Sequence, residues 1–304
     1  LTYRDFVALE LSSVASEETR EYWDRTLAGH AVLELPRLPE ASRGGVAGVA
    51  GQLGVQTVPL SDALSAGLKS LAQRAGVPLK SVLLAAHVRV LGLVGNQTDV
   101  LTGLVSNSRP EESDGERVLG LFLNTVPFRL ELEGGTWLEL VQRTFQAERR
   151  LLGHRRYPMG RLQRKRGGQP LFETAFNFNH FHVYQALQDQ GSVEVSEASV
   201  FEYTNFTLMA NFDLDPASAE LTVRLNYDSG QFTADQAALL SGYYQRTLQA
   251  MTTDPASALY AAELLSDAGY RTGAFVGAFV LASRWGLDQG FETYTEPQGA
   301  YDPT

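Results

Sequence analysis

The stretch from Pro78 to Leu93 is apolar on nearly every side, and this feature most constrains how the chain can fold. A helix with apolar residues all round must be buried among other elements rather than lie on a surface. Pro78 suits the first turn of such a helix, because the N–H that proline lacks has no partner there. A strand pattern over Asp99–Val105 follows directly. The chain therefore has to pack layers around this helix.

Other periodic patterns add helices and strands on both sides of this pair. The predicted helices are Ser16–Leu27, Ser61–Ala75, Trp137–Leu152, Thr233–Met251 and a short Leu259–Ala268. The predicted strands are Leu53–Val58, Leu121–Leu132, Leu171–Val183, Phe206–Leu214 and Leu221–Tyr227. This mixture predicts an α/β sandwich with a mixed β-sheet packed with helices.

Local signals mark several boundaries. Ser16, Ser61 and Thr233 are suited to cap helices, and Gln236 stands at the capping-box position after Thr233. Residues Leu33–Gly51 are rich in Pro, Gly and Ala without periodicity, so we predict a surface loop.

Composition excludes several classes of function. The 304 residues contain no cysteine, which excludes disulfides, thiolate metal sites and cysteine nucleophiles. The net charge of −10 argues against nucleic-acid binding, which needs a cationic face. No apolar stretch is long enough for a membrane span, and Leu1–Glu10 lacks the apolar region of a signal peptide. We expect a cytoplasmic protein and, since the first residue is Leu, a piece of a longer chain.

The histidines predict no metal site. His180 and His182 would lie on one side of a strand, but no third histidine or carboxylate pattern stands near them. We interpret both as structural.

The most informative stretches are two neighbouring motifs, Gly103-Leu-Val-Ser-Asn-Ser-Arg-Pro110 and Leu119-Gly-Leu-Phe-Leu-Asn-Thr-Val-Pro-Phe-Arg129. They resemble the condensation domain of nonribosomal peptide synthetases, whose members carry Gly-x-x-x-Asn-x-Arg-Pro and then Gly-x-Phe-x-Asn-Thr ending in Arg. Further segments resemble the family in the same order: Tyr3-Arg-Asp-Phe6 with Tyr22-Trp23, His154-Arg-Arg-Tyr-Pro158, and Pro170-Leu-Phe172 with Phe176-Asn-Phe-Asn. Arg155 replaces the Gln of the family pattern. The resemblance covers about residues 1–267.

The resemblance implies a chloramphenicol-acetyltransferase-like fold, of which this chain would be the C-terminal lobe only. In the family, a tunnel between two lobes admits two phosphopantetheine arms. Carrier proteins present these arms, so no directly bound cofactor or metal is expected. The implied partners are peptidyl or acyl carrier proteins, adjacent synthetase domains and the missing N-terminal lobe, with no nucleic acid and no membrane.

The family's active-site motif, His-His-x-x-x-Asp-Gly, is absent. None of the histidines at 30, 87, 154, 180 and 182 has a neighbouring histidine or a following Asp-Gly. No catalytic residue is therefore assigned, and the chain alone is expected to be inactive.

Four residues are candidates for the tunnel by this resemblance. Asn124 and Thr125 would form hydrogen bonds near the tunnel, although Asn124 could instead hold strand ends together. Asn107 and Arg109 would shape the tunnel wall, or else be a turn-stabilising asparagine and a surface ion pair.

The segment 149–166 holds eight Lys and Arg residues and no acidic residue. Arg155, Arg156 and Arg161 are candidates for docking an acidic carrier protein, because a local cationic face steers such partners. The alternative is a solvated face at the end of a helix.

The tail resembles a different family. Segments 262–280 and 284–294 are similar to an internal stretch of sulfatases, without the sulfatase catalytic residue or metal ligands. We predict that residues 268–304 are a sulfatase-like fragment of loops and short elements rather than an independent domain. The chain would be a fusion or assembly chimera joined within Leu264–Ala268.

Two other functions remain open at this point. The chain could be a non-catalytic module that binds carrier proteins, or it could come from an epimerisation domain, a sister of the same fold.

Overall fold

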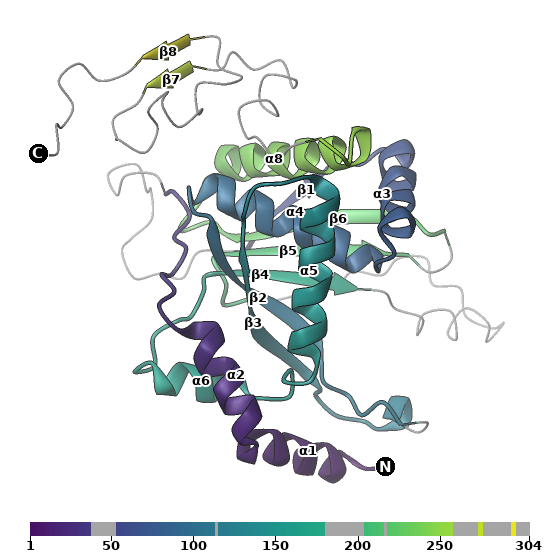
Figure 1. Cartoon of the computed structure of the whole chain (residues 1–304), viewed down its shortest axis with the longest axis vertical. Coiled ribbons are helices and arrows are strands. Elements are labelled where there is room, and N and C mark those ends of the chain that lie inside the picture. The colour runs from purple at the N-terminus through teal and green to yellow at the C-terminus, as the bar shows by residue number, and fades with distance from the viewer. Residues whose placement is uncertain are drawn as a thin grey trace, which may run out of the picture.

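The computed structural model describes residues 1–37, 53–112, 115–179, 204–215 and 218–257, with the backbone of two short strands in the tail (Figure 1). The tail strands, β7 (Gly273–Phe275) and β8 (Thr293–Thr295), pair in parallel. The helix predicted over Leu259–Ala268 lies outside the described residues.

A six-stranded sheet forms the centre of the fold (Figure 1). Its strands are β1 (Leu53–Val58), β2 (Asp99–Asn107), β3 (Leu123–Glu131), β4 (Thr174–Asn179), β5 (Leu208–Leu214) and β6 (Leu221–Asp228). Their order in space is β1-β6-β5-β4-β2-β3. Strand β4 runs parallel to β2 and β5, whereas the other neighbours are antiparallel. The predicted mixed sheet is confirmed.

One layer of helices packs against this sheet (Figure 1). It consists of α3 (Asp62–Ala75), α4 (Leu79–Val94), α5 (Trp137–Leu152) and α8 (Ala234–Thr253). Three more helices lie on the β3 side of the sheet: α1 (Tyr3–Ala15), α2 (Glu17–Leu27) and α6 (Met159–Lys165). A short 3₁₀ turn, η2 (Gly115–Arg117), precedes β3.

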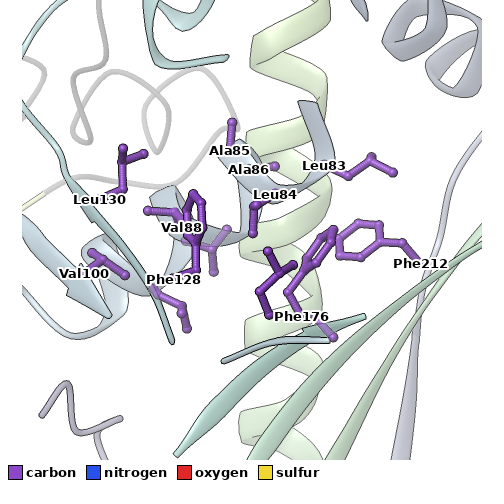
Figure 2. Packing of buried hydrophobic residues seen from close by; sticks show 14 of the residues in the cluster. Leu83, Leu84, Ala85, Ala86, Val88, Val100, Phe128, Leu130, Phe176 and Phe212 are labelled. Carbon is purple, nitrogen blue, oxygen red and sulfur yellow. The ribbon is translucent and has the colours of Figure 1, made fainter. Parts of the chain in front are cut away.

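Helix α4 is the centre of the core, as its sequence predicts. Residues Leu83 to Ala86 and Val88 are completely buried, and Figure 2 shows them above Phe176 of β4 and Phe212 of β5. Leu79, at the start of the helix, is only half-buried. Contacts on so many sides explain why most residues of this helix are apolar.

A chain of polar groups crosses this core beside α4. His87 is fully buried, with Nδ1 2.7 Å from the Tyr244 hydroxyl and Nε2 3.1 Å from Thr102 Oγ1. Thr102 Oγ1 also donates to the carbonyl oxygen of Thr174, at 3.0 Å. Because that hydroxyl has only one proton, Nε2 of His87 donates to Thr102, and Nδ1 accepts from Tyr244. The network ties α4 to β2, β4 and α8.

Helix boundaries follow the predicted caps. The side chains of Ser16, Ser61 and Thr233 each accept a hydrogen bond from a backbone N–H of the first turn. Gln236 completes the capping box by accepting from the Thr233 N–H at 3.0 Å. Helix α3 ends at Gly76, whose φ of +66° is the left-handed conformation that glycine adopts readily.

The predicted surface loop over Leu33–Gly51 is wrong at its start. Leu33 and Leu35 are only 1% and 2% exposed. The Leu35 N–H donates to Glu173, which also forms an ion pair with Arg37. This extended segment is therefore fixed to the body by tertiary contacts that have no periodicity in the sequence.

Two helices were not predicted, α1 and α6. Helix α1 buries only Phe6 and α6 buries only Leu162, so neither has the wide buried face of the predicted helices. Among the described residues, no single helix is long and apolar enough to cross a membrane. The pair α3 and α4 meets that criterion only jointly, across a bend of 106°.

Candidate functional site

The predicted tunnel residues gather where β2 ends and β3 begins, beside the loop between α5 and α6. Asn124, the second residue of β3, donates from Nδ2 to the carbonyl oxygens of Arg155 and Tyr157, both at 2.9 Å. Its Oδ1 is 3.5 Å from the N–H of Met159. The Asn124 amide therefore holds the loop onto the sheet, a contact that differs from the tie between strand ends considered for it.

Arg155 adds to this contact from the loop side. We call the contact of Asn107 and Asn124 in the strands with Arg155 in the loop the joint. Its guanidinium donates to the carbonyl oxygens of Asn107 (3.1 Å) and Leu152 (2.8 Å) and forms an ion pair with Glu111 (2.7 Å). Arg155 is only 6% exposed. With three acceptors at this contact, the guanidinium offers little surface to a carrier protein, so the structure does not favour docking through Arg155.

Asn107 and Arg109 shape the turn that leaves β2. Asn107 Oδ1 accepts from the Arg109 N–H at 3.0 Å, an Asx turn. The Arg109 guanidinium donates to the carbonyl oxygens of Gly115 (2.7 Å) and Val118 (2.5 Å) and lies 4.1 Å over the Phe122 ring. Arg109 thus has a structural role at this turn. The Asn107 side chain is exposed, and its Nδ2 has no partner among the described residues.

Because side chains alternate along a strand, Thr125 faces away from the side of β3 on which Val126 and Phe128 are buried. It pairs across the sheet with Val105 and stands beside Gly103, where an added Cβ would come within 2.8 Å of its methyl group. The same Cβ would come within 2.4 Å of the Phe172 ring. The Thr125 hydroxyl forms no hydrogen bond with any residue that the structure describes, so it is the least committed of the four candidates.

Ser108 belongs to the same joint and was not singled out from the sequence. It is buried, and its hydroxyl donates to the carbonyl oxygen of Arg155 at 3.3 Å. Its own carbonyl oxygen accepts from Arg156 Nε at 3.2 Å. The signal that could have found it is its place between Asn107 and Arg109 in the same motif.

Helix α2 fixes the loop from outside. Thr19 Oγ1 is 3.0 Å from His154 Nδ1, and the His154 ring stacks on Tyr22 with centroids 4.1 Å apart. Partial burial lowers the pKa of His154. The Tyr22-Trp23 and His154 segments of the family pattern therefore meet in space.

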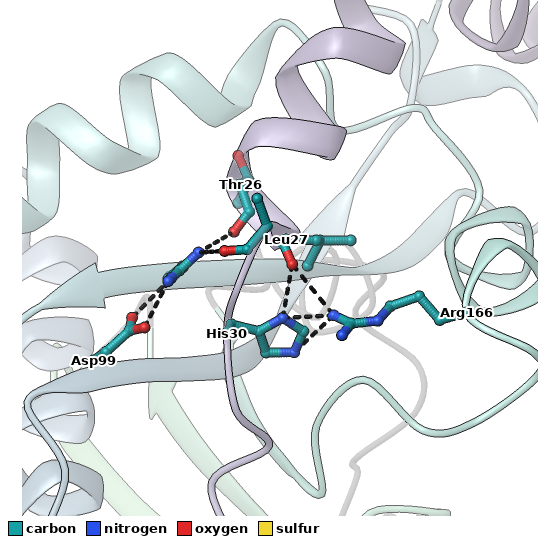
Figure 3. Close-up of polar contacts among 7 residues, drawn as sticks. Thr26, Leu27, His30, Asp99 and Arg166 are labelled. Carbon is teal, nitrogen blue, oxygen red and sulfur yellow. Dashed lines mark hydrogen bonds and ion pairs between the residues drawn. The ribbon is translucent and has the colours of Figure 1, made fainter.

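The C-terminal end of α2 is held by two arginines (Figure 3). Arg129 of β3 donates to the carbonyl oxygens of Thr26 (2.9 Å) and Ala28 (2.8 Å) and binds Asp99 through two nitrogens. The hydrogen bonds to Asp99 raise the pKa of Arg129. Arg166 donates to the carbonyl oxygen of Leu27 at 3.3 Å and also lies against His30. Arg129, the last residue of the motif 119–129, therefore caps the C-terminal end of α2.

The other two predicted docking residues differ in exposure. Arg161, on α6, is exposed. Arg156 is half-buried and donates to the carbonyl oxygens of Ser108 and Arg109. Burial and the neighbouring Arg155 lower its pKa. Of the three predicted docking cations, Arg161 is the one fully available to a partner.

Two cavities lie away from this joint. One of about 420 Å³ lies between α8 and the end of α4, and one of about 1030 Å³ lies between α5, β3 and the end of α3. Neither cavity is lined by Asn107, Arg109, Asn124 or Thr125. No cluster of three metal-ligating side chains occurs among the described residues, and His180 and His182 lie outside them.

Comparison with known proteins gives consistent results. The condensation-domain family model matches residues 1–272. The AMB antimetabolite synthetase AmbE of Pseudomonas aeruginosa is 35% identical over 291 residues, which cover 95% of this chain and 13% of that protein. Tyrocidine synthase 3 of Brevibacillus parabrevis is 29% identical over 288 residues, which cover 88% of this chain and 4% of that protein. The chain thus spans a small fraction of the synthetases that it matches.

Solved structures show the same fold. The condensation domain of the Monacolin K polyketide synthase MokA has a TM-score of 0.69 at 18% identity, covering 84% of this chain and 62% of that one. The first condensation domain of the calcium-dependent antibiotic synthetase has a TM-score of 0.64 at 19% identity, covering 84% and 57%.

Proposed function

Because this chain belongs to the condensation-domain family of nonribosomal peptide synthetases, we propose that it is the C-terminal lobe of a domain that joins two carrier-bound thioesters through a peptide bond. The observation that carries the proposal is the joint itself. Three family-like motifs, 103–110, 119–129 and 154–158, are distant in sequence but interlock through Asn107, Asn124 and Arg155. Such an interlock indicates that the three motifs serve one structure.

The chemistry assigns this lobe a limited role. The amine of one aminoacyl thioester attacks the carbonyl carbon of the other, a C–N bond forms, the C–S bond breaks, and a thiol leaves. A protein accelerates this step by holding the two reactants together, accepting the amine's proton and stabilising the oxyanion. The histidine motif suited to the proton transfer would lie in a part of the polypeptide outside this sequence.

The residues of this chain would form one wall of the tunnel. Thr125 and the Nδ2 of Asn107 offer polar groups with no partner among the described residues, so they could hydrogen bond to a substrate arm. Asn124 and Arg109 would act as positioning residues, since their polar groups hold the loop and the turn. The phosphopantetheine arm would arrive covalently attached to a carrier, as part of the substrate.

A turnover assay tests this proposal. The complete condensation domain of the same polypeptide, supplied with loaded carriers, should give a dipeptidyl carrier that mass spectrometry detects, whereas the 304-residue chain should give none. Thr125→Val should slow the reaction without changing the melting temperature, and Thr125→Ser should restore most of the rate. Turnover by the 304-residue chain, or inversion of the substrate's α-carbon without condensation, would contradict the assignment, the latter in favour of an epimerisation domain.

A non-catalytic carrier-binding module is the second candidate, and the exposed Arg161 favours it. Carrier binding by the 304-residue chain should weaken steeply with salt and with Arg161→Glu. Arg74→Glu is the matched control, since Arg74 is an exposed arginine on α3. Binding that ignores both salt and Arg161 would exclude docking through this surface.

We also propose that residues 268–304 come from a sulfatase-like sequence joined within Leu264–Ala268. Long-read sequencing of the source DNA tests this. A reading frame that continues as sulfatase, or a synthetase frame that continues past Ala268 without this tail, would support the junction. A synthetase frame that carries the same tail and continues as synthetase would overturn it.

A further inference from the structure

Strand β1 forms one edge of the central sheet and lacks the features that usually keep an edge strand from pairing. It pairs with β6 on one side, and on its other side there is no strand among the described residues. Its six residues, Leu53-Gly-Val-Gln-Thr-Val58, include no charged residue and no proline. The opposite edge strand, β3, carries Pro127, Arg129 and Glu131. Proline and charged side chains protect edge strands from pairing, so β1 is the unprotected edge.

The hydrogen bonds of the neighbouring strands show which backbone groups of β1 point away from the sheet. The Asp228 N–H donates to the carbonyl oxygen of Thr207, which lies on the β5 side of β6. Backbone groups alternate between the two sides of a strand, so the next residue, Tyr227, directs its groups toward β1, where its partner is Gly54. By the same alternation, three residues of β1 direct their N–H and C=O groups outward: Leu53, Val55 and Thr57.

Most of these outward groups are available to a partner. No residue that the structure describes hydrogen bonds to the Val55 backbone or accepts from the Thr57 N–H. The Thr57 carbonyl oxygen accepts from the Ser241 hydroxyl of α8 at 3.2 Å, which agrees with its outward direction, and from Gln56 Nε2 at 3.0 Å. The Val55 side chain is 56% exposed. Accessible donors and acceptors in a row on an edge strand are a template for another strand.

We infer that two copies of this chain associate by pairing their β1 strands antiparallel across a two-fold axis. A register centred on Val55 matches the outward groups. The two Val55 residues then exchange their hydrogen bonds, and the Thr57 N–H of each copy donates to the Leu53 carbonyl oxygen of the other. The two sheets become one continuous sheet. Because both copies use the same strand, the association closes at a dimer. The inference does not depend on the proposed function.

The side chains of β1 suit a second copy of the same strand. In this register the two exposed Val55 side chains face each other, and β-branched pairs across two strands stabilise a sheet. Leu53 faces Thr57 of the other copy, so no like charges meet within the pair. A second copy also supplies an uncharged strand of equal length in matching register. The net charge of −10 on each chain opposes association at long range, so added salt should strengthen the pairing.

Sedimentation equilibrium of the 304-residue chain tests the inference. A contact this small gives a weak dimer, so the molar mass is measured from about 10 µM to about 1 mM protein. Val55→Lys should lower the association constant by about 10-fold or more, because it places two like charges directly opposite each other. Val32→Lys is the matched control, since Val32 is 40% exposed but lies outside the sheet. It should leave the association unchanged, and both variants should keep the melting temperature of the monomer.

Two further measurements test the register itself. Val55→Lys and Val55→Glu should each be monomeric alone and should form a mixed dimer when combined, because the register places their opposite charges together. The chain has no cysteine, so Val55→Cys introduces a single thiol. An oxidant should join two such chains through a disulfide, because the Cα atoms of a hydrogen-bonded pair lie about 5.5 Å apart. Val32→Cys should give no covalent dimer under the same conditions.

Three results would overturn the inference. The first is a monomer at every concentration and salt concentration. The second is a dimer that Val55→Lys does not weaken, and the third is the absence of a mixed dimer from the Lys and Glu variants. If Leu121→Asp abolished association and Val55→Lys did not, the contact would belong to the exposed leucines of the segment 119–123 instead of to β1.

Discussion

Lowering the pH from 8 to 5 should cost the folded chain about 2 kcal/mol of stability through His87 alone. Burial lowers the pKa of His87 from 6.5 to about 3. A depressed pKa means that the stabilising contribution is complete above pH 6.5 and is lost as the pH falls through the interval down to 3. At pH 5 the unfolded histidine is 1.5 units below its pKa, and each unit is worth about 1.36 kcal/mol.

The structure explains why the folded protein resists protonation. Neutral His87 has both ring nitrogens in use, since Nε2 donates to Thr102 and Nδ1 accepts from Tyr244. A second proton would turn Nδ1 into a donor facing the Tyr244 hydroxyl. The added charge would also have no carboxylate partner, since no acidic group takes part in the network.

Urea denaturation of the wild-type chain and of His87→Gln at pH 8, 7, 6 and 5 measures the effect. Glutamine can hydrogen bond but does not titrate, so the wild type should lose about 2 kcal/mol more than the variant between pH 8 and 5. Other histidines and carboxylates contribute equally to both proteins and cancel in the difference. Parallel stability curves would refute the reasoning.

A second measurement protects the test if His87→Gln fails to fold. Nitrogen NMR of histidine-labelled wild-type protein should show His87 neutral, with the proton on Nε2, down to pH 5. A His87 ring that titrates near pH 6.5 in the folded chain would equally refute the argument.

Three substitutions give further tests by urea denaturation. Asn124→Ala should destabilise the chain by about 1–3 kcal/mol, because two loop carbonyls lose their donor; a change below about 0.5 kcal/mol would show that water replaces the amide. Gly103→Ala should cost about 1–3 kcal/mol by forcing its methyl group into the Phe172 ring, whereas Gly160→Ala on α6, with open space around it, should be neutral or slightly stabilising. Arg129→Gln should speed amide exchange in the last turn of α2, and unchanged exchange there would contradict its capping role.

The sequence predicts those parts of the fold that short-range chemistry decides. Ser61 and Thr233 begin their helices because a side-chain oxygen satisfies a nearby N–H, and Gly76 ends one because its φ is positive. The burial of α4 follows from its apolar surface. All of these signals are contained within about one helical turn or one element.

What the sequence does not predict depends on distant partners. Leu33 and Leu35 are buried because Glu173, far along the chain, fixes their segment. Arg155 is surrounded by basic residues, which suggests an exposed cation, but the distant Asn107 carbonyl of β2 and the Glu111 carboxylate help to enclose it. The family resemblance placed Asn107 and Asn124 together at the tunnel but assigned Arg155 to a docking face, so the contact of Arg155 with this group was not expected. Which of their atoms interact could not be inferred from spacing.

The joint between the strands and the loop also bears on how a domain of this family can change during evolution. Most of its acceptors are main-chain carbonyls: Asn124 binds two in the loop, and Arg155 binds two in return. Every residue type supplies a carbonyl, so substitutions at the accepting positions leave those hydrogen bonds available. The loop can therefore diverge in sequence while keeping its path. Asn124 has little freedom to vary, because its side-chain amide donates both hydrogen bonds to the loop.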